Sequence, residues 1–285
     1  MAKTDRSGPN LQGKVVIVTG GGGGLGRAMA LGFAECGARV AVLDIDRGSA
    51  EDVANEVKQA HGENAAIALA CSIANQSECR IAVQRTIDEL GGLHMLVNNA
   101  AIGMRFISED FTDIPPKFWE YTPDRFQALM DVNVTGTFLM SQAVVHHMMD
   151  QRWGRIVCVT TSLDSMMRGG NMPYGQSKAA IEAAAASWAE DLEGTGVTVN
   201  VLIPGGAADT QMIPAHSSLD RDRLNKPEVM VAPICWLASD ASDGVTRRRF
   251  IGCDWDPSLP AAEAAEAAGG PAAWGALPMR RKRAT

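Results

Sequence analysis

The sequence has 285 residues, of which 46% are hydrophobic and 21% are charged, so it encodes a globular chain with a sizeable core and not a disordered one. Its formal net charge of −7 gives no electrostatic footprint for nucleic acid as a main partner. No apolar run is long enough for a membrane-spanning helix, and the polar first residues contain no apolar signal core. We therefore expect a cytoplasmic protein with neither a nucleic-acid nor a membrane partner.

Short apolar runs bounded by glycine or polar residues alternate with stretches of helical periodicity through most of the chain. Such runs indicate strands that are buried on both faces of a parallel sheet. We expect these strands at residues 14–19, 39–44, 65–70, 93–98, 155–160 and 197–203. Thr122 and Pro123 supply an N-cap and a first-turn proline for one of the intervening helices. The alternation predicts an α/β fold with a doubly wound parallel sheet (Rossmann-type) in a single domain.

Three segments interrupt this alternation. Residues 102–121 form a long connection rich in aromatic residues and proline, which is typical of a functional loop. Residues 205–226 are rich in glycine, alanine, serine and aspartate, and from Asp256 the chain is rich in alanine, proline and glycine, unlike a core element. We expect a Rossmann-type catalytic domain at 1–255, with 102–121 and 205–226 as substrate-side loops, and a C-terminal tail at 256–285.

A glycine-rich stretch, Thr19–Gly26, directly follows the first strand and opens the first helix. Glycine lets the backbone approach a pyrophosphate closely, and the start of the helix offers free N–H groups to it. The residues expected to bind a dinucleotide here are Gly20, Gly22, Gly23, Gly24, Leu25 and Gly26. Asp44 ends the second strand, where a carboxylate accepts hydrogen bonds from the adenosine ribose and repels a 2′-phosphate. This residue favours NAD over NADP.

The thiols and imidazoles show no pattern of metal ligands. The six cysteines have no C-x-x-C spacing, and most lie in apolar stretches, which is typical of free thiols in a core. The five histidines show no ligand spacing either. We expect no metal and no disulfide framework, in keeping with a reducing compartment.

Tyr174 and Lys178 are four residues apart, so both side chains project from one face of a helix. A free phenol titrates near pH 10, which is too high for efficient proton exchange at neutral pH. A neighbouring ammonium favours the phenolate, so we expect Lys178 to lower the pKa of Tyr174. Three hydroxyl residues, Thr160, Thr161 and Ser162, end the preceding strand. With the glycine-rich stretch, they indicate proton transfer beside a nucleotide.

Taken in order, these residues resemble the short-chain dehydrogenase/reductase family in its ordinary single-domain form, over about residues 12–254. Thr19–Gly26 is similar to the family's cofactor motif, and Tyr174–Lys178 is similar to its Y-x-x-x-K motif. The other matches are Asn98-Asn99-Ala100, Asn133 within Asp131–Gly136, and Pro204-Gly205. One such motif is weak evidence, but five in the right order are strong.

The resemblance implies a role for each matched residue. Tyr174 exchanges the proton of the substrate hydroxyl, Lys178 tunes Tyr174 and holds the nicotinamide ribose, and Asn133 holds a water that connects Lys178 to solvent. Asn133 is also a polar residue that can kink its helix. The implied cofactor contacts beyond the glycine-rich stretch and Asp44 are Ser72, Ile73, Asn99, Ala100, Tyr174, Lys178, Pro204 and Gly205.

The sequence also departs from the family pattern. Ser72 stands where an aspartate commonly faces the adenine, Ala101 replaces a glycine, and Arg247 stands where glycine is usual. The family's catalytic serine usually stands 13 residues before the tyrosine, which here is Thr161, whereas Ser162 stands 12 before it. Ser162 matches in residue type, so we predict that it polarises the substrate oxygen, with Thr161 as the alternative.

The implied reaction is reversible interconversion of a secondary alcohol and a ketone by hydride transfer with NAD. The alternative is a catalytically silent NAD-binding regulatory or scaffolding protein of the same fold, against which the set Asn133, Ser162, Tyr174 and Lys178 argues. The aromatic residues of 102–121 favour an apolar or ring-bearing small-molecule substrate. The resemblance further implies a homodimer or homotetramer that pairs the helices around Thr122–Asp150 and Tyr174–Glu193.

Overall fold

The computed structural model describes residues 8–274. Within that range eight strands form one sheet in the order β3-β2-β1-β4-β5-β6-β7-β8. Neighbouring strands are parallel except β7 and β8, which are antiparallel. The strands are β1 (Val15–Thr19), β2 (Arg39–Asp44), β3 (Ala66–Ala70), β4 (Met95–Asn98), β5 (Gly154–Val159), β6 (Val197–Ile203), β7 (Arg248–Ile251) and β8 (Gly269–Pro271).

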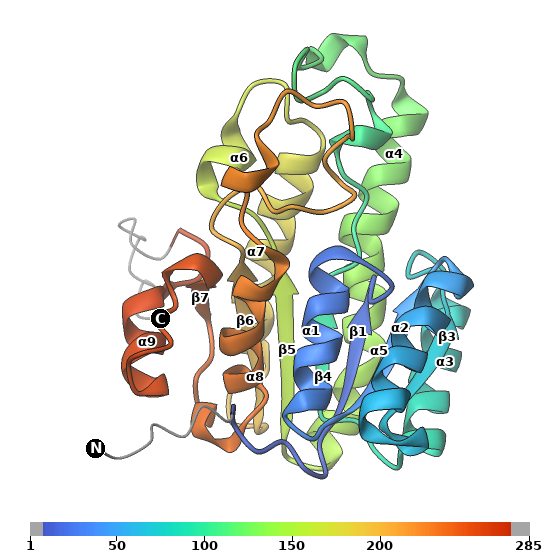
Figure 1. The fold of residues 1–285 in the computed structure, drawn as a ribbon, viewed down its shortest axis with the longest axis vertical. Coiled ribbons are helices and arrows are strands. Elements are labelled where there is room, and N and C mark those ends of the chain that lie inside the picture. Colours follow the sequence, from blue (N-terminus) through green and yellow to red (C-terminus); the bar gives the residue numbers. More distant parts are fainter. Residues whose placement is uncertain (1–7, 275–285) are drawn as a thin grey trace, which may run out of the picture.

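Helices cover both faces of this sheet, with α1, α2 and α8 on one face and α3, α5 and α7 on the other (Figure 1). The α-helices of the described range are α1 (Gly24–Glu35), α2 (Arg47–His61), α3 (Gln76–Leu90), α4 (Pro123–Met130), α5 (Thr137–Asp150), α6 (Leu163–Met167), α7 (Tyr174–Asp191), α8 (Val231–Leu237) and α9 (Ala261–Ala268). None of them is both long enough and apolar enough to span a bilayer.

The central strand β1 shows how the sequence pattern produces a sheet covered by helices on both faces. All five of its residues are β-branched and buried, which suits a strand covered on both faces. Val16 and Val18 pack with α1, α2 and α8, whereas Val15 and Ile17 pack with α3, α5 and α7. The predicted doubly wound parallel sheet and its six predicted strands are confirmed, with small differences at the strand ends.

The expectation that the chain from Asp256 is unlike a core element is wrong for part of that segment. α9 buries three alanines against the core on the α1 and α8 face, and β8 pairs with β7 at the edge of the sheet. The sequence pattern could not show this, because α9 is nearly all alanine and β8 reads Gly-Gly-Pro, so neither carries an apolar periodicity.

Three connections gather beyond the carboxyl ends of the strands, at the top of Figure 1, where the green, yellow-green and orange segments lie together. They are residues 102–121, 163–172 and 205–226, and we call them the loop lobe. Hydrogen bonds join the first and the third: His216 Nε2 lies 2.9 Å from Asp110 Oδ1, and the Ser218 N–H donates to Asp113 Oδ1 at 3.3 Å. The lobe overhangs the point between β1 and β4 where the strand order reverses, which is where open α/β sheets bind ligands.

Candidate functional site

The glycine-rich stretch forms a turn that requires glycine. Gly20 and Gly24 adopt φ angles of 61° and 51°, in the left-handed region that side chains disfavour. A Cβ on Gly26 would lie 2.0 Å from the carbonyl oxygen of Gly20. The N-cap of α1, Gly23, makes no side-chain cap, so the first N–H groups of this helix remain free at a cavity that Gly22 also lines.

Asn99 and Thr19 tie this turn to the end of β4. Asn99 Nδ2 donates to the carbonyl oxygens of Thr19 at 2.9 Å and of Gly20 at 3.1 Å. The Thr19 hydroxyl donates to the Val97 carbonyl oxygen and accepts from the N–H groups of Asn99 and Ala100, each at 3.0 Å. These bonds span the point where the strand order reverses, so the turn is rigid before any nucleotide binds.

Asp44 lies at the end of β2 on the rim of the same cavity. Its Oδ2 accepts the Gly22 N–H at 3.0 Å and its Oδ1 accepts the Asp46 N–H at 3.1 Å. Asp46 also lines the cavity, while the nearby Arg47 guanidinium turns to Glu51 at 2.7 Å. This end therefore presents two carboxylates, which suit the hydroxyls of a ribose better than a phosphate.

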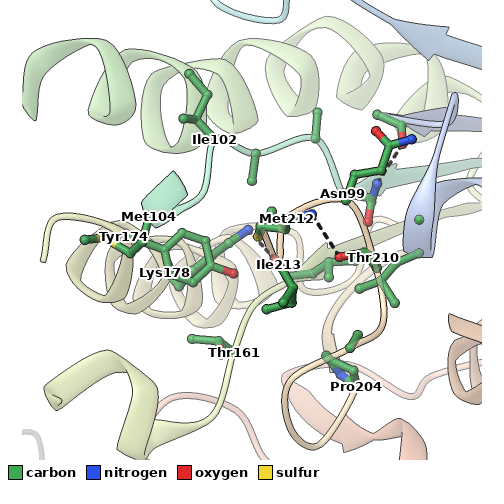
Figure 2. Close-up of a pocket in the computed structure, with 18 of the residues that line it drawn as sticks. Asn99, Ile102, Met104, Thr161, Tyr174, Lys178, Pro204, Thr210, Met212 and Ile213 are labelled. Atoms are coloured by element: carbon green, nitrogen blue, oxygen red, sulfur yellow. Dashed lines mark hydrogen bonds between the residues drawn. The ribbon is translucent and has the colours of Figure 1, made fainter. Parts of the chain in front are cut away.

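One cavity of about 940 Å³ runs from the glycine turn to the loop lobe, a volume typical of ligand sites (Figure 2). Its far end is lined mainly by apolar side chains, namely Ile102, Met104, Phe111, Pro115, Met212, Ile213 and Leu219. Arg168 also lines this end, and its guanidinium pairs with Asp164. The cavity thus has backbone N–H groups and carboxylates at one end, which fit a dinucleotide. It has apolar side chains at the other end, which fit a small apolar molecule.

Tyr174 and Lys178 stand on the first turns of α7 and project side by side into the cavity (Figure 2). Lys178 Nζ donates to the Val159 carbonyl oxygen at 2.9 Å and lies 5.7 Å from the centre of the Tyr174 ring. Burial raises the pKa of Tyr174 to about 12 and lowers the pKa of Lys178 to about 8. The expectation that Lys178 lowers the pKa of Tyr174 therefore differs from the structure, because the phenol loses its hydration on burial.

The two candidate hydroxyls at the end of β5 have different surroundings, although both residues line the cavity. Ser162 is the N-cap of α6: its Oγ accepts the Ser165 N–H at 3.2 Å and donates to Ser165 Oγ at 3.0 Å. Within residues 8–274 the Thr161 hydroxyl has no such bond, and Figure 2 shows Thr161 at the strand end beside Tyr174 and Lys178. Of the two hydroxyls, that of Thr161 is free to donate to a ligand.

Asn133 is buried in a π-helical turn, Asp131–Gly136, which joins α4 to α5. Its Oδ1 accepts the Ile102 N–H at 2.7 Å, and its Nδ2 donates to the Ile102 carbonyl oxygen at 3.0 Å and to Ser177 Oγ at 2.9 Å. Ser177 precedes Lys178 on α7, so Asn133 fastens the start of the 102–121 loop to the helix that carries the Tyr/Lys pair. π-turns of this kind often occur at functional sites.

The cavity brings most of the sequence-predicted site residues together: Gly20, Gly22, Gly23, Gly24, Leu25, Asp44, Ser72, Ile73, Asn99, Ala100, Ser162, Tyr174, Lys178 and Pro204. Three predicted residues do not line it, namely Gly26, Asn133 and Gly205. Gly205 has a φ of 95°, and a Cβ there would lie 2.2 Å from Cys253 Sγ, so it serves the turn after β6. Ser72 lines the cavity while its N–H donates to Glu78 Oε2 at 2.8 Å.

Sequence reasoning missed two charged residues beside the site. Glu182 on α7 is buried and forms an ion pair with Arg249 on β7. β7 was not predicted, because Arg248–Ile251 lacks the apolar alternation of a strand. The signal available for Glu182 was its spacing, one helical turn after Lys178 on the same face.

The described residues 8–274 contain no group of three or more His, Cys, Asp and Glu side chains that could hold a metal ion. All six cysteines are free.

Comparisons with known proteins agree with this geometry. The family model described as short chain dehydrogenase matches residues 14–219. A 3-oxoacyl-(acyl-carrier-protein) reductase from Thermotoga maritima is 31% identical over 257 residues, covering 86% of this chain and 97% of its own. A cyclohexanol dehydrogenase from a Rhodococcus species is 32% identical over 257 residues, with coverage of 83% and 93%. The crystal structure of a 3-ketoacyl-(acyl-carrier-protein) reductase from Brucella melitensis complexed with NADH is 28% identical, has a TM-score of 0.72 and covers 83% of this chain and 95% of that one.

Proposed function

The chain belongs to the short-chain dehydrogenase/reductase family of oxidoreductases acting on alcohols and ketones, and on that premise we propose that it interconverts a secondary alcohol and a ketone with NAD. The observation that carries the proposal is a single cavity with a glycine turn and Asp44 at one end and Tyr174, Lys178 and Thr161 at the other. A silent scaffolding protein has no use for a lysine buried beside a tyrosine, because burying an ammonium costs free energy.

NAD, when bound, supplies the hydride acceptor or donor for this reaction. Tyr174 gives its proton to the substrate oxygen during reduction and takes it back during oxidation. Since burial raises the pKa of Tyr174 to about 12, the phenol stays protonated at neutral pH and is ready to donate. The pKa of Lys178, lowered to about 8, leaves it mostly an ammonium at pH 7, which stabilises the phenolate as it forms.

For the hydroxyl that polarises the substrate oxygen, we propose Thr161 in place of Ser162. The Ser162 hydroxyl already donates to Ser165 Oγ while it caps α6, and donating to a ligand would give up that hydrogen bond. The Thr161 hydroxyl has no competing partner within the described residues, and Thr161 stands 13 residues before Tyr174. A donor that is free in the resting protein needs no rearrangement when the oxyanion develops.

We propose NAD and not NADP because the adenosine end of the cavity carries Asp44 and Asp46, and the guanidinium of the adjacent residue Arg47 pairs with Glu51. A 2′-phosphate there would meet carboxylates without a compensating cation. A relative, the Brucella melitensis reductase, was crystallised with NADH.

We propose an apolar secondary alcohol as the substrate class, since Ile102, Met104, Phe111, Met212 and Ile213 line the cavity on the side of Tyr174. Each hydroxyl of a polyol would lose its hydration against these side chains without regaining a hydrogen bond. The relative described as a cyclohexanol dehydrogenase acts on a molecule of this kind. We also propose a reducing compartment such as the cytoplasm, which suits six free cysteines.

A steady-state assay tests the function and the hydroxyl assignment together. NAD is offered with cyclohexanol, 1-phenylethanol and the polyol xylitol to the unaltered protein and to Thr161→Val and Ser162→Ala. We expect turnover of the two apolar alcohols above that of xylitol, a loss of about 100-fold in kcat for Thr161→Val and a loss of under tenfold for Ser162→Ala. Absence of turnover with every alcohol contradicts the function, and the reverse order of the two variants returns the role to Ser162.

A further inference from the structure

Thr161 lies just beyond the last hydrogen bond that connects β5 to β6. The Thr160 N–H donates to the Leu202 carbonyl oxygen at 3.2 Å, and past that point the Thr161 carbonyl oxygen accepts from Nη2 of Arg249 at 2.7 Å. Arg249 belongs to β7, on the far side of β6, where it pairs in register with Val201. Its side chain therefore crosses β6 to hold the backbone of Thr161.

The same guanidinium forms an ion pair with Glu182 on α7. Nη1 of Arg249 contacts both carboxylate oxygens of Glu182, one of them at 2.5 Å, and the two side chains are only 13% and 1% exposed. Glu182 in turn accepts the Thr160 hydroxyl at 2.9 Å. Since Lys178 holds the Val159 carbonyl oxygen at 2.9 Å, three charged side chains hold three consecutive residues at the end of β5.

From this geometry we infer that Arg249, braced by Glu182, is a positioning residue that sets the Thr161 hydroxyl against the substrate oxygen. The inference rests on the role proposed above for Thr161. A buried ion pair adds little net stability compared with apolar residues of the same size, because both charges lose hydration, so stability alone is a weak reason for it. A donor to a developing oxyanion, by contrast, acts only when it is held within a fraction of an ångström of its best position. The planar guanidinium of Arg249, which joins the end of β5 to α7, provides that constraint.

Arg249→Lys separates the two functions of the guanidinium. Lysine keeps a cation opposite Glu182 but loses the planar fork that also reaches the Thr161 carbonyl oxygen. We expect kcat with the best apolar alcohol to fall about tenfold, while KM, the Kd for NAD and the thermal midpoint change little. Arg248→Lys is the matched control, because Arg248 is a neighbour on β7 that pairs with Glu266 at the surface, and we expect unchanged kinetics.

A double-mutant cycle with Thr161→Val decides whether Arg249 acts through Thr161. If it does, Arg249→Lys costs less than a further twofold once the Thr161 hydroxyl is gone. A full tenfold loss in the Thr161→Val background overturns the inference, because Arg249 would then act through another group. Wild-type kcat in Arg249→Lys alongside a slow Thr161→Val overturns the inference and leaves the proposed function standing. Wild-type kcat in Thr161→Val overturns the role of Thr161 and this inference with it.

If Arg249→Lys does not fold, the double variant Glu182→Gln with Arg249→Met replaces it. This pair leaves no uncompensated buried charge, so folding is expected, but the hold on the Thr161 carbonyl oxygen is lost. The same tenfold fall in kcat supports the inference, and wild-type kcat overturns it.

Discussion

Burial is the main cause of the shifted pKa of both Tyr174 and Lys178. The Tyr174 phenol loses hydration at the wall of the cavity. The Lys178 ammonium, one helical turn further along α7, also loses hydration and donates a hydrogen bond to the Val159 carbonyl oxygen. Burial therefore favours the neutral form of each residue. The resting protein holds a phenol that is ready to give up a proton, and an ammonium whose charge is lost above a pH of about 8.

This state can be measured directly because the chain has only two tyrosines. In a Tyr121→Phe variant without cofactor, tyrosinate absorbance should report Tyr174 alone, and we expect its ionisation near pH 12 in place of the ordinary 10. The raised pKa stabilises the folded chain below pH 10, and this contribution is lost as the pH rises through 12. The unfolded protein in denaturant is the control and should titrate near 10. Ionisation of the folded protein below pH 9 would contradict the account of Tyr174 as a buried phenol.

Asp44 carries the proposed cofactor choice. In Asp44→Asn one oxygen remains as an acceptor for the Gly22 N–H, but the charge that repels a 2′-phosphate is gone. We expect the Kd for NADP to exceed the Kd for NAD at least tenfold in the unaltered protein, about 1.4 kcal/mol, and the ratio to shrink in the variant. Asp52→Asn, an equal charge change at an exposed position of α2, should leave the ratio unchanged. If calorimetry finds the same ratio of the two Kd values in all three proteins, Asp44 does not determine the cofactor preference.

How much of the site the sequence could predict depends on the range of the contacts. The glycine turn, Asp44 and the Tyr174–Lys178 pair were predictable, because each depends on neighbours close in the chain or on one strand end. The sequence could not decide which of Thr161 and Ser162 polarises the substrate oxygen. That choice depends on whether Ser162 caps a helix, and the structure shows that it is the N-cap of α6. Arg249 could not be assigned a role, because its contacts with Glu182 and Thr161 cross the sheet.

At the scale of elements, the edge of the sheet is where the sequence pattern failed. α9 and β8 add to the fold without any large apolar residue, so their attachment depends on small side chains that allow close approach. Trp255, at the start of this segment, is largely buried beside Trp236, and the centres of the two rings lie 5.7 Å apart. The segment after β7 is thus part of the core on the α1 and α8 face.

A matched pair of substitutions on α9 tests this packing. Ala265 is buried and Ala267 is exposed on the same helix, so aspartate at either position carries the same helix-propensity cost. We expect Ala265→Asp to destabilise the protein by about 2 kcal/mol or more, because the carboxylate loses hydration without a partner. Ala267→Asp should change stability by less than about 0.5 kcal/mol. Equal denaturation midpoints for the two variants would mean that α9 does not pack as described.

At the scale of the molecule, we propose that the chain forms a homodimer or homotetramer through α5 and α7. Phe138 and Met149 are 45% and 37% exposed, and their spacing puts both on one face of α5. On α7 a run of alanines permits close approach of another helix. Exposed apolar residues gathered on one helix face are typical of a surface that another protein covers.

Light scattering tests the assembly. We expect the mass of a dimer or tetramer for the unaltered protein and a shift toward monomer for Phe138→Lys, since a buried lysine without a partner disfavours the interface. Ile81→Lys is the control, because Ile81 is an exposed apolar residue on α3, outside the two helices of the proposed interface, and should leave the mass unchanged. A monomer in the unaltered sample rules the proposal out.

The central claim, that Tyr174 moves the proton in a reaction between NAD and an alcohol, is tested most directly by Tyr174→Phe. The change removes one hydroxyl and keeps the ring that packs at the start of α7. We predict that kcat falls by roughly 10²–10⁴-fold, the usual contribution of a general acid or base, while calorimetry finds the Kd for NAD within about threefold of the original. A Tyr174→Phe protein that keeps more than half of its turnover would contradict the account, because the proton would then travel by another group.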